Sequence, residues 1–221
     1  MSSLAATIEP QATYADLLAV PKPLVAEILC GELHTHPRPT PSHAVTSSSI
    51  GDELVSPFHK GRGGPGGGWI LDEPEVHLGE HVLVPDLAGW CRERLPKILE
   101  TAYFELALDW VCEVLSPSTA RTARVLKLPI YVQFGVTHCW LADPKIKLLE
   151  AFALQDDGQW TLLGSYGGND EIRVAPFDAI TFPLSALWAE SGGSCATFQP
   201  KASASLFAST NGAFKHNVLR I

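Results

Sequence analysis

The sequence predicts one α/β domain over residues 1–190, followed by an irregular tail over residues 191–221. The chain has 221 residues, of which 46% are hydrophobic and 18% are charged, enough for a single domain with a sizeable core. Residues 109–115 (DWVCEVL) are almost wholly apolar, which is typical of a strand covered on both faces. A helical segment and a further strand follow. The tail is rich in Ser, Ala and Gly, and we expect it to be poorly ordered.

The first third of the chain predicts a short helix, a hairpin and a longer helix. Residues 14–20 have helical spacing and end before two prolines. Residues 24–36 alternate well enough for two strands that meet at Gly31. After the rigid segment PRPTP, we expect Ser42 to cap a helix that continues to about Lys60.

The middle of the chain predicts a connector and further strands. Residues 61–68 (GRGGPGGG) are read as a mobile loop, because no Gly-Lys-Ser/Thr follows as in a phosphate-binding loop. Residues 69–79 predict a hairpin or two short strands. Residues 81–90 predict one buried strand that contains the Pro85-Asp86 pair.

The second half predicts a helix between two strands and then a hairpin. The helix is expected from SPST to about Phe134, with a kink at Pro129. Residues 136–144 predict the second strand. Residues 145–154 and 159–166 should pair across the turn at 155–158. Residues 177–188 predict a last short strand and one helical turn.

Composition excludes several classes of protein. No apolar run approaches the roughly 20 residues that span a bilayer, so we expect no membrane partner. Without a basic and apolar leader, the expected location is cytoplasmic. Five scattered cysteines without a CxxC pair argue against a disulfide framework or a zinc site. The formal charge of −8 disfavours nonspecific nucleic-acid binding over the whole surface, although a local basic groove stays open.

Two carboxylates stand out as candidate metal ligands. Glu113 lies inside an apolar strand, where a charge is costly to bury unless it is paired or binds a metal. A salt bridge or a strand end at the surface would also explain it. Asp86 follows Pro85 and could simply mark a strand end. If the two strands are neighbours, both carboxylates project to one place, and their oxygens suit Mg²⁺ or Mn²⁺.

A lysine completes the candidate catalytic group. Ala123, Lys127 and Tyr131 are spaced i, i+4 and i+8, so they share one helical face, which we expect to be turned toward Glu113. There Lys127 could orient or deprotonate an attacking water and screen charge on phosphorus. A solvated surface lysine is the alternative interpretation.

The segments VPDLAGW, DWVCEVLSPST and KLPIYVQFGVTHCWLADP resemble the Uma-type family of restriction endonucleases. The resemblance covers roughly residues 14–188 and implies a restriction-endonuclease-like PD-(D/E)XK core, a mixed sheet flanked by helices, with Mg²⁺ (or Mn²⁺) as cofactor and DNA as substrate. By position, Asp86 corresponds to the Asp of the family's Pro-Asp pair and Glu113 to its second acid. We expect both to hold the metal, with the Val114 carbonyl as a further ligand. The lysine usually found two residues past the second acid would fall on Leu115, and Lys127 replaces it.

The resemblance also adds Glu32 and His43 as second-tier site residues, beside Tyr131. The family commonly has an Asp four residues before the lysine, where this chain has Ala123. The leading hypothesis is a Mg²⁺-dependent DNA endonuclease, and a homodimer would suit cleavage of two strands. The rival hypotheses are a catalytically degenerate module for nucleic-acid or protein interaction, and a hydrolase that uses the same metal site on another substrate.

Overall fold

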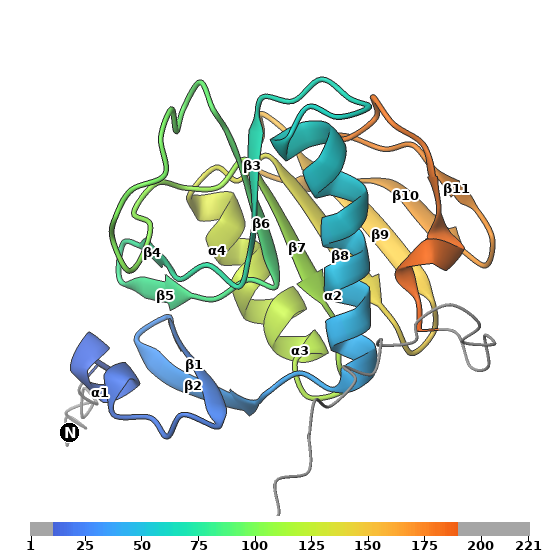
Figure 1. The fold of residues 1–221 in the computed structure, drawn as a ribbon. Coiled ribbons are helices and arrows are strands. Elements are labelled where there is room, and N and C mark those ends of the chain that lie inside the picture. Colours follow the sequence, from blue (N-terminus) through green and yellow to red (C-terminus); the bar gives the residue numbers. More distant parts are fainter. Residues whose placement is uncertain (1–10, 190–221) are drawn as a thin grey trace, which may run out of the picture. The chain divides into compact units, whose positions relative to one another are not determined.

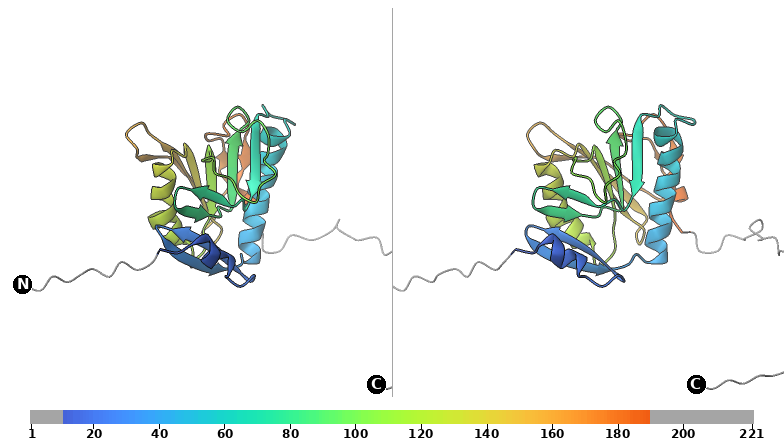
Figure 2. Two further views of the ribbon diagram at one scale, coloured as in Figure 1. Left: turned by 90° about the vertical axis from the view of Figure 1, so that its left-hand side faces the viewer. Right: turned by 60° about the vertical axis from the view of Figure 1, so that its left-hand side comes forward.

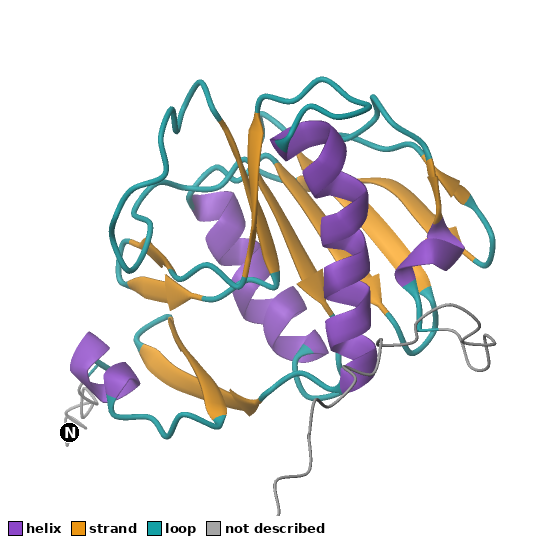
Figure 3. Cartoon of the chain, viewed as in Figure 1, coloured by secondary structure: helices purple, strands orange, loops and turns teal. Residues whose placement is uncertain are grey.

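A six-stranded mixed sheet forms the centre of the protein (Figures 1 and 3). The computed structural model describes residues 11–189, so the predicted tail over 191–221 lies outside the described residues. The strand order is β10-β9-β8-β7-β6-β3, and only β7 and β8 run parallel. The strands are β3 (Gly68–Asp72), β6 (Leu87–Cys91), β7 (Trp110–Val114), β8 (His138–Asp143), β9 (Leu148–Leu154) and β10 (Trp160–Gly167).

Helices cover both faces of this sheet (Figure 2). One face carries α2 (Pro41–Leu54). The other carries a helical segment made of three consecutive pieces, α3 (Ala120–Thr122), η2 (Ala123–Lys127) and α4 (Leu128–Gln133). Side chains of β7 alternate between the faces. Cys112 packs in the core cluster with Leu54 of α2, and Val111 packs in the cluster with Ile130 of α4. Glu113 therefore projects toward the helical segment.

A four-stranded sheet, in the order β2-β1-β5-β4, packs beside the first. Its strands are β1 (Leu24–Leu29), β2 (Glu32–Pro37), β4 (Val76–Leu78) and β5 (His81–Leu83). The β1–β2 turn uses Cys30 and Gly31 with φ of 53° and 79°, the positive values that a tight two-residue hairpin requires. The remaining elements are α1 (Tyr14–Leu18), η1 (Val55–His59), which continues α2, β11 (Glu171–Ile172), β12 (Phe182–Pro183) and η3 (Leu184–Leu187).

The segment around Pro85-Asp86 differs from the prediction. Residues 81–90 form two strands in two different sheets, β5 and β6, and not one buried strand. Proline has no N–H to donate to a ladder, so the chain leaves one sheet and enters the other at this point. Of the two alternatives predicted for residues 69–79, the two short strands are found, since β3 and β4 belong to different sheets and do not pair as a hairpin. Asp86 consequently lies between the sheets, immediately before β6.

The two long helical segments are modified at their prolines. Thr40, and not Ser42, caps α2, because its hydroxyl accepts the His43 N–H while Pro41 takes the first helical position. Near Pro129 the helix forms a π turn and not a simple kink. The Leu128 N–H bonds the carbonyl of Ala123, five residues earlier, which widens the helix just before the proline.

Candidate active site

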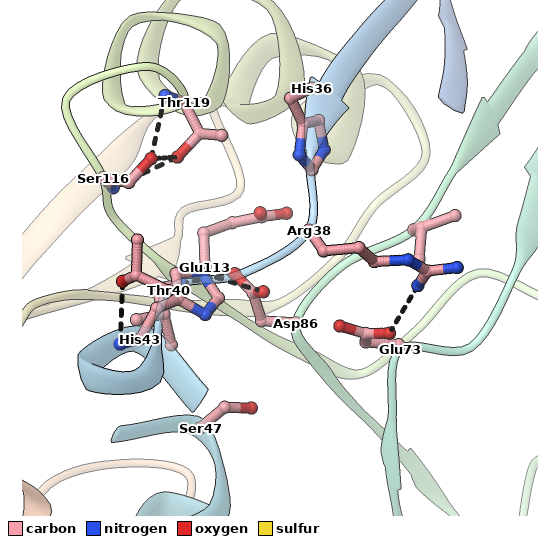
Figure 4. A network of polar contacts seen from close by, with 12 residues as sticks. His36, Arg38, Thr40, His43, Ser47, Glu73, Asp86, Glu113, Ser116 and Thr119 are labelled. Carbon is pink, nitrogen blue, oxygen red and sulfur yellow. Dashed lines mark hydrogen bonds and ion pairs between the residues drawn. The ribbon is translucent and has the colours of Figure 1, made fainter. Parts of the chain in front are cut away.

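A cavity of about 320 Å³ brings the candidate residues together. It is lined by the inner face of the β1–β2 hairpin, the start of α2 and the chain that leaves β7. The charged or titratable side chains at its floor come from five segments far apart in the sequence: Glu27, His43, Asp86, Glu113 and Lys127. Figure 4 shows Glu113 and Asp86 close to each other, with His43 beside Asp86.

Glu113 lies at the centre of a buried ionic group. Its side chain, on β7, is only 5% exposed. The Lys127 ammonium lies 2.7 Å from Oε1 and 2.8 Å from Oε2, and the Tyr131 hydroxyl donates to Oε1 at 2.5 Å. Burial raises the pKa of Glu113 to about 7, although the Lys127 charge opposes that rise; the Asp86 charge adds to it.

Lys127 reaches this position from the end of the π turn. It is the last residue of η2, and it is 4% exposed. Its Nζ also lies 2.9 Å from Oε1 of Glu27 and 3.5 Å from the carbonyl oxygen of Val84. Burial alone would lower the pKa of Lys127, but the charges of Glu113 and Glu27 outweigh it and raise that pKa. The lysine therefore stays a cation at neutral pH.

Glu27 is a site residue that the sequence analysis missed. It lies on β1, is 2% exposed, and accepts the Val84 N–H at 2.8 Å through the same oxygen that contacts Lys127. Oε2 lies 3.9 Å from Nε2 of His36. The signal was available, because Glu27 stands inside the apolar run LVAEIL just as Glu113 stands inside DWVCEVL. We call Glu27, Glu113, Lys127 and Tyr131 the lysine cluster.

Asp86 and His43 form a second group at the edge of the cavity, which we call the Asp86 pair. Oδ2 of Asp86 accepts the backbone N–H of Val114 at 2.7 Å, and Oδ1 lies 3.2 Å from Nε2 of His43. The Asp86 side chain is 16% exposed. Burial would lower the pKa of His43, but the hydrogen bond and charge of Asp86 prevail and raise it.

Glu32, the other second-tier acid, does not join the site. Its side chain is 81% exposed at the start of β2, and its neighbour is His34, at 3.8 Å. Position along the strand explains this placement, because Glu32 and His34 share one face of β2 but Glu32 lies at the turn end of the hairpin, next to Gly31. In the β1–β2 register Glu32 faces Leu29, whereas Glu27 pairs with His34, and both members of that second pair line the cavity.

The two carboxylates offer oxygen ligands for a small divalent cation. Among residues 11–189, no group of three or more His, Cys, Asp or Glu side chains is arranged to hold a metal ion. Mg²⁺, however, commonly takes one or two protein carboxylates and completes its shell with water and substrate phosphate. A carboxylate has about four lone-pair sites. Asp86 uses two of these sites in the contacts above and Glu113 uses three, so both carboxylates have lone pairs left for a metal ion.

The charge of the site also favours a cation. Three carboxylates meet there (Glu27, Asp86 and Glu113), while Lys127 and the titratable His43 are the basic partners that contact them most closely. The raised pKa of Glu113 shows the effect of this negative surplus together with burial. The donor set therefore fits Mg²⁺ or Mn²⁺. The Val114 peptide lies beside Asp86, to which it presents its N–H; a metal contact by its carbonyl stays a prediction.

Comparison with known proteins identifies the family and the fold. Residues 12–185 match the family "Uma2: Putative restriction endonuclease". A solved structure described as "a putative nuclease belonging to DUF820", from Anabaena variabilis, is similar with a TM-score of 0.64 at 20% sequence identity. The alignment covers 80% of this chain and 97% of that one. The fold is therefore restriction-endonuclease-like, as predicted.

No curated protein matches the chain. Within the described residues, no helix is long and apolar enough to cross a membrane.

Proposed function

The chain belongs to the Uma2 family, and on that premise we propose that it is a divalent-metal-dependent nuclease that hydrolyses phosphodiester bonds of DNA. The observation that carries the proposal is the convergence of Asp86, Glu113 and Lys127 in one cavity, from three separate elements. Two carboxylates can hold a divalent metal for phosphodiester hydrolysis, and a lysine beside them can stabilise the charge that develops on phosphorus. We propose Mg²⁺ or Mn²⁺ as cofactor, held by Asp86 and Glu113 with the Val114 carbonyl as a further ligand.

The ion, when bound, would lower the pKa of a coordinated water and polarise the scissile phosphate. Asp86 is oriented for its part by the Val114 N–H and by His43. Glu113 is oriented by Tyr131 and Lys127. Both side chains are thus fixed before substrate arrives, which reduces the entropic cost of reaching the reactive geometry.

Lys127 acts in this proposal as a fixed positive charge. Its raised pKa keeps it protonated, which disfavours the role of general base that the sequence also allowed. The ammonium can donate hydrogen bonds to the attacking water or to a phosphate oxygen, and it stabilises the charge that develops on phosphorus. Its position is set by two carboxylates, Glu113 and Glu27.

Replacement of Asp86 tests the assignment. Asp86→Ala should lower Mg²⁺-dependent cleavage of plasmid DNA by about 100-fold or more, because it removes a metal ligand, while circular dichroism stays unchanged. Glu32→Ala is the matched control, an exposed acid of the same domain outside the cavity. Cleavage by Asp86→Ala at the wild-type rate would contradict the proposal.

A second candidate function is a degenerate module of the same fold that binds nucleic acid or protein without catalysis. The observation in its favour is the extent to which Glu113 is already engaged, by Lys127 on both oxygens and by Tyr131. A structural ion pair of this kind would bind Mg²⁺ or Mn²⁺ barely at all, so metal affinity separates the two candidates. The homodimer and the cytoplasmic location stay predictions.

A further inference from the structure

We infer that Glu27 is a positioning residue of the proposed nuclease site, which holds Lys127 and the segment before Asp86 in register with each other. The expected loss of kcat rests on the proposed function, whereas the contact between Glu27 and Lys127 does not. Glu27 lies on the β1–β2 hairpin, far in sequence from both acids that carry the metal in that proposal. Its Oε1 is engaged by the Lys127 ammonium and the Val84 N–H, so we expect it to act through these neighbours.

The contacts of one oxygen carry the inference. Oε1 of Glu27 lies 2.9 Å from the Lys127 ammonium and accepts the Val84 N–H at 2.8 Å. Val84 is two residues before Asp86, and its carbonyl oxygen lies 3.5 Å from the same ammonium. Glu27, Lys127 and Val84 therefore form a closed triangle. A single carboxylate links the helical segment that bears the lysine to the connector that bears Asp86.

Burial explains why this link should be rigid. Glu27 is 2% exposed and Lys127 is 4% exposed, so bulk water has little access to either partner. A buried carboxylate is tolerated only when it is paired and hydrogen-bonded, and the triangle meets both conditions. Without the charge of Glu27, Glu113 would be the only close anionic partner of Lys127 among residues 11–189, and the lysine could turn away from the geometry described above.

Glu27 also couples the hairpin to the site. On the same inner face, Oε2 lies 3.9 Å from His36, and His36 lines the mouth of the cavity. The β1–β2 hairpin is therefore part of the active site by charge as well as by shape. No acid of the helix itself performs this task, because Ala123 occupies the position one turn before Lys127.

The test compares Glu27→Gln with Glu32→Gln, a neutralised acid on the same hairpin whose side chain is exposed. Gln keeps the shape and a carbonyl acceptor for Val84 but removes the charge that holds Lys127. We expect Glu27→Gln to lower kcat about 10- to 100-fold with little change in KM, because the substrate-binding surface is intact. Glu27→Asp, which keeps the charge, should recover part of kcat. Glu32→Gln should behave as wild type.

A second readout needs no catalysis. The ¹H–¹⁵N signal of the buried Lys127 ammonium, assigned with Lys127→Met, should be visible in wild type and in Glu32→Gln, and it should shift or disappear in Glu27→Gln. If wild type cleaves no DNA but the ammonium signal responds as expected, the proposed nuclease function fails while the Glu27–Lys127 link stands. If kcat and the ammonium signal are both unchanged in Glu27→Gln, the inference is overturned. Should Glu27→Gln not fold, Glu27→Asp decides through the same two readouts.

Discussion

The lysine cluster and the Asp86 pair line one cavity, but they differ in burial and in how many of their hydrogen-bonding positions are already used. In the lysine cluster every charged group has close partners, and Glu113 and Lys127 are at most 5% exposed. In the Asp86 pair the carboxylate is 16% exposed and keeps more free lone pairs. The difference suggests a division of work. The lysine cluster fixes geometry and charge, while Asp86 is the more accessible of the two acids for metal and substrate.

The largest effect on stability should come from the lysine cluster. Lys127→Met keeps the apolar stem but leaves Glu27 and Glu113 buried without their cation, which should lower the free energy of unfolding by about 3–5 kcal/mol. Arg124→Met is the control on the same helical segment, since Arg124 pairs with Glu150 near the surface with 42% and 20% of the side chains exposed. It should cost at most about 1 kcal/mol. If urea unfolding showed equally small losses of unfolding free energy for both variants, burial would not make the Lys127 ion pairs more important than the Arg124 pair.

A smaller effect should come from the Asp86 pair, through pH. The pKa of His43 in the folded protein is above its usual value of 6.5, so protonation favours the folded state. The stabilisation by His43 is therefore fully present below about pH 6.5 and is lost as the pH rises through the folded-state pKa. The difference in free energy of unfolding between wild type and His43→Gln should be larger at pH 6 than at pH 8.

His138 provides a control of opposite sign for this measurement. Burial lowers the pKa of His138, against the charges of Asp109 and Asp178, so its protonation opposes folding. Relative to His138→Gln, wild type should be more stable at pH 8 than at pH 6. If both differences changed in the same direction, the assigned ion pair between His43 and Asp86 would be wrong.

The sequence predicts the parts of the site that depend on local pattern. Glu113 was found because a charge inside an apolar strand needs a partner, and the i, i+4 spacing of Lys127 and Tyr131 placed them on one helical face. The structure brings these three side chains together. The strand, helix, strand order from β7 to β8 likewise follows from apolar runs separated by a helical pattern.

Long-range pairing decides what the sequence could not predict. The role of Glu27 depends on the position of β1 beside β5, which no local pattern indicates. Glu32 was a candidate because of the family resemblance, but it lies at the turn end of the hairpin and its side chain is exposed to solvent. A strand end at Pro85-Asp86 was one of the interpretations that the sequence allowed, because proline has no N–H to donate to a ladder. The sheets that β5 and β6 join could not be predicted, because the strands with which they pair lie far away in sequence.

Metal binding tests the central claim most directly. Calorimetric titration with Mn²⁺ should compare wild type with Asp86→Asn, which keeps an acceptor for the Val114 N–H and leaves the lysine cluster intact. We predict that wild type binds Mn²⁺ and that Asp86→Asn binds it at least about 10-fold more weakly, both alone and with duplex DNA present. A folded wild type that binds no Mn²⁺ under either condition, or an Asp86→Asn variant that binds it equally well, would contradict the account and favour the non-catalytic module.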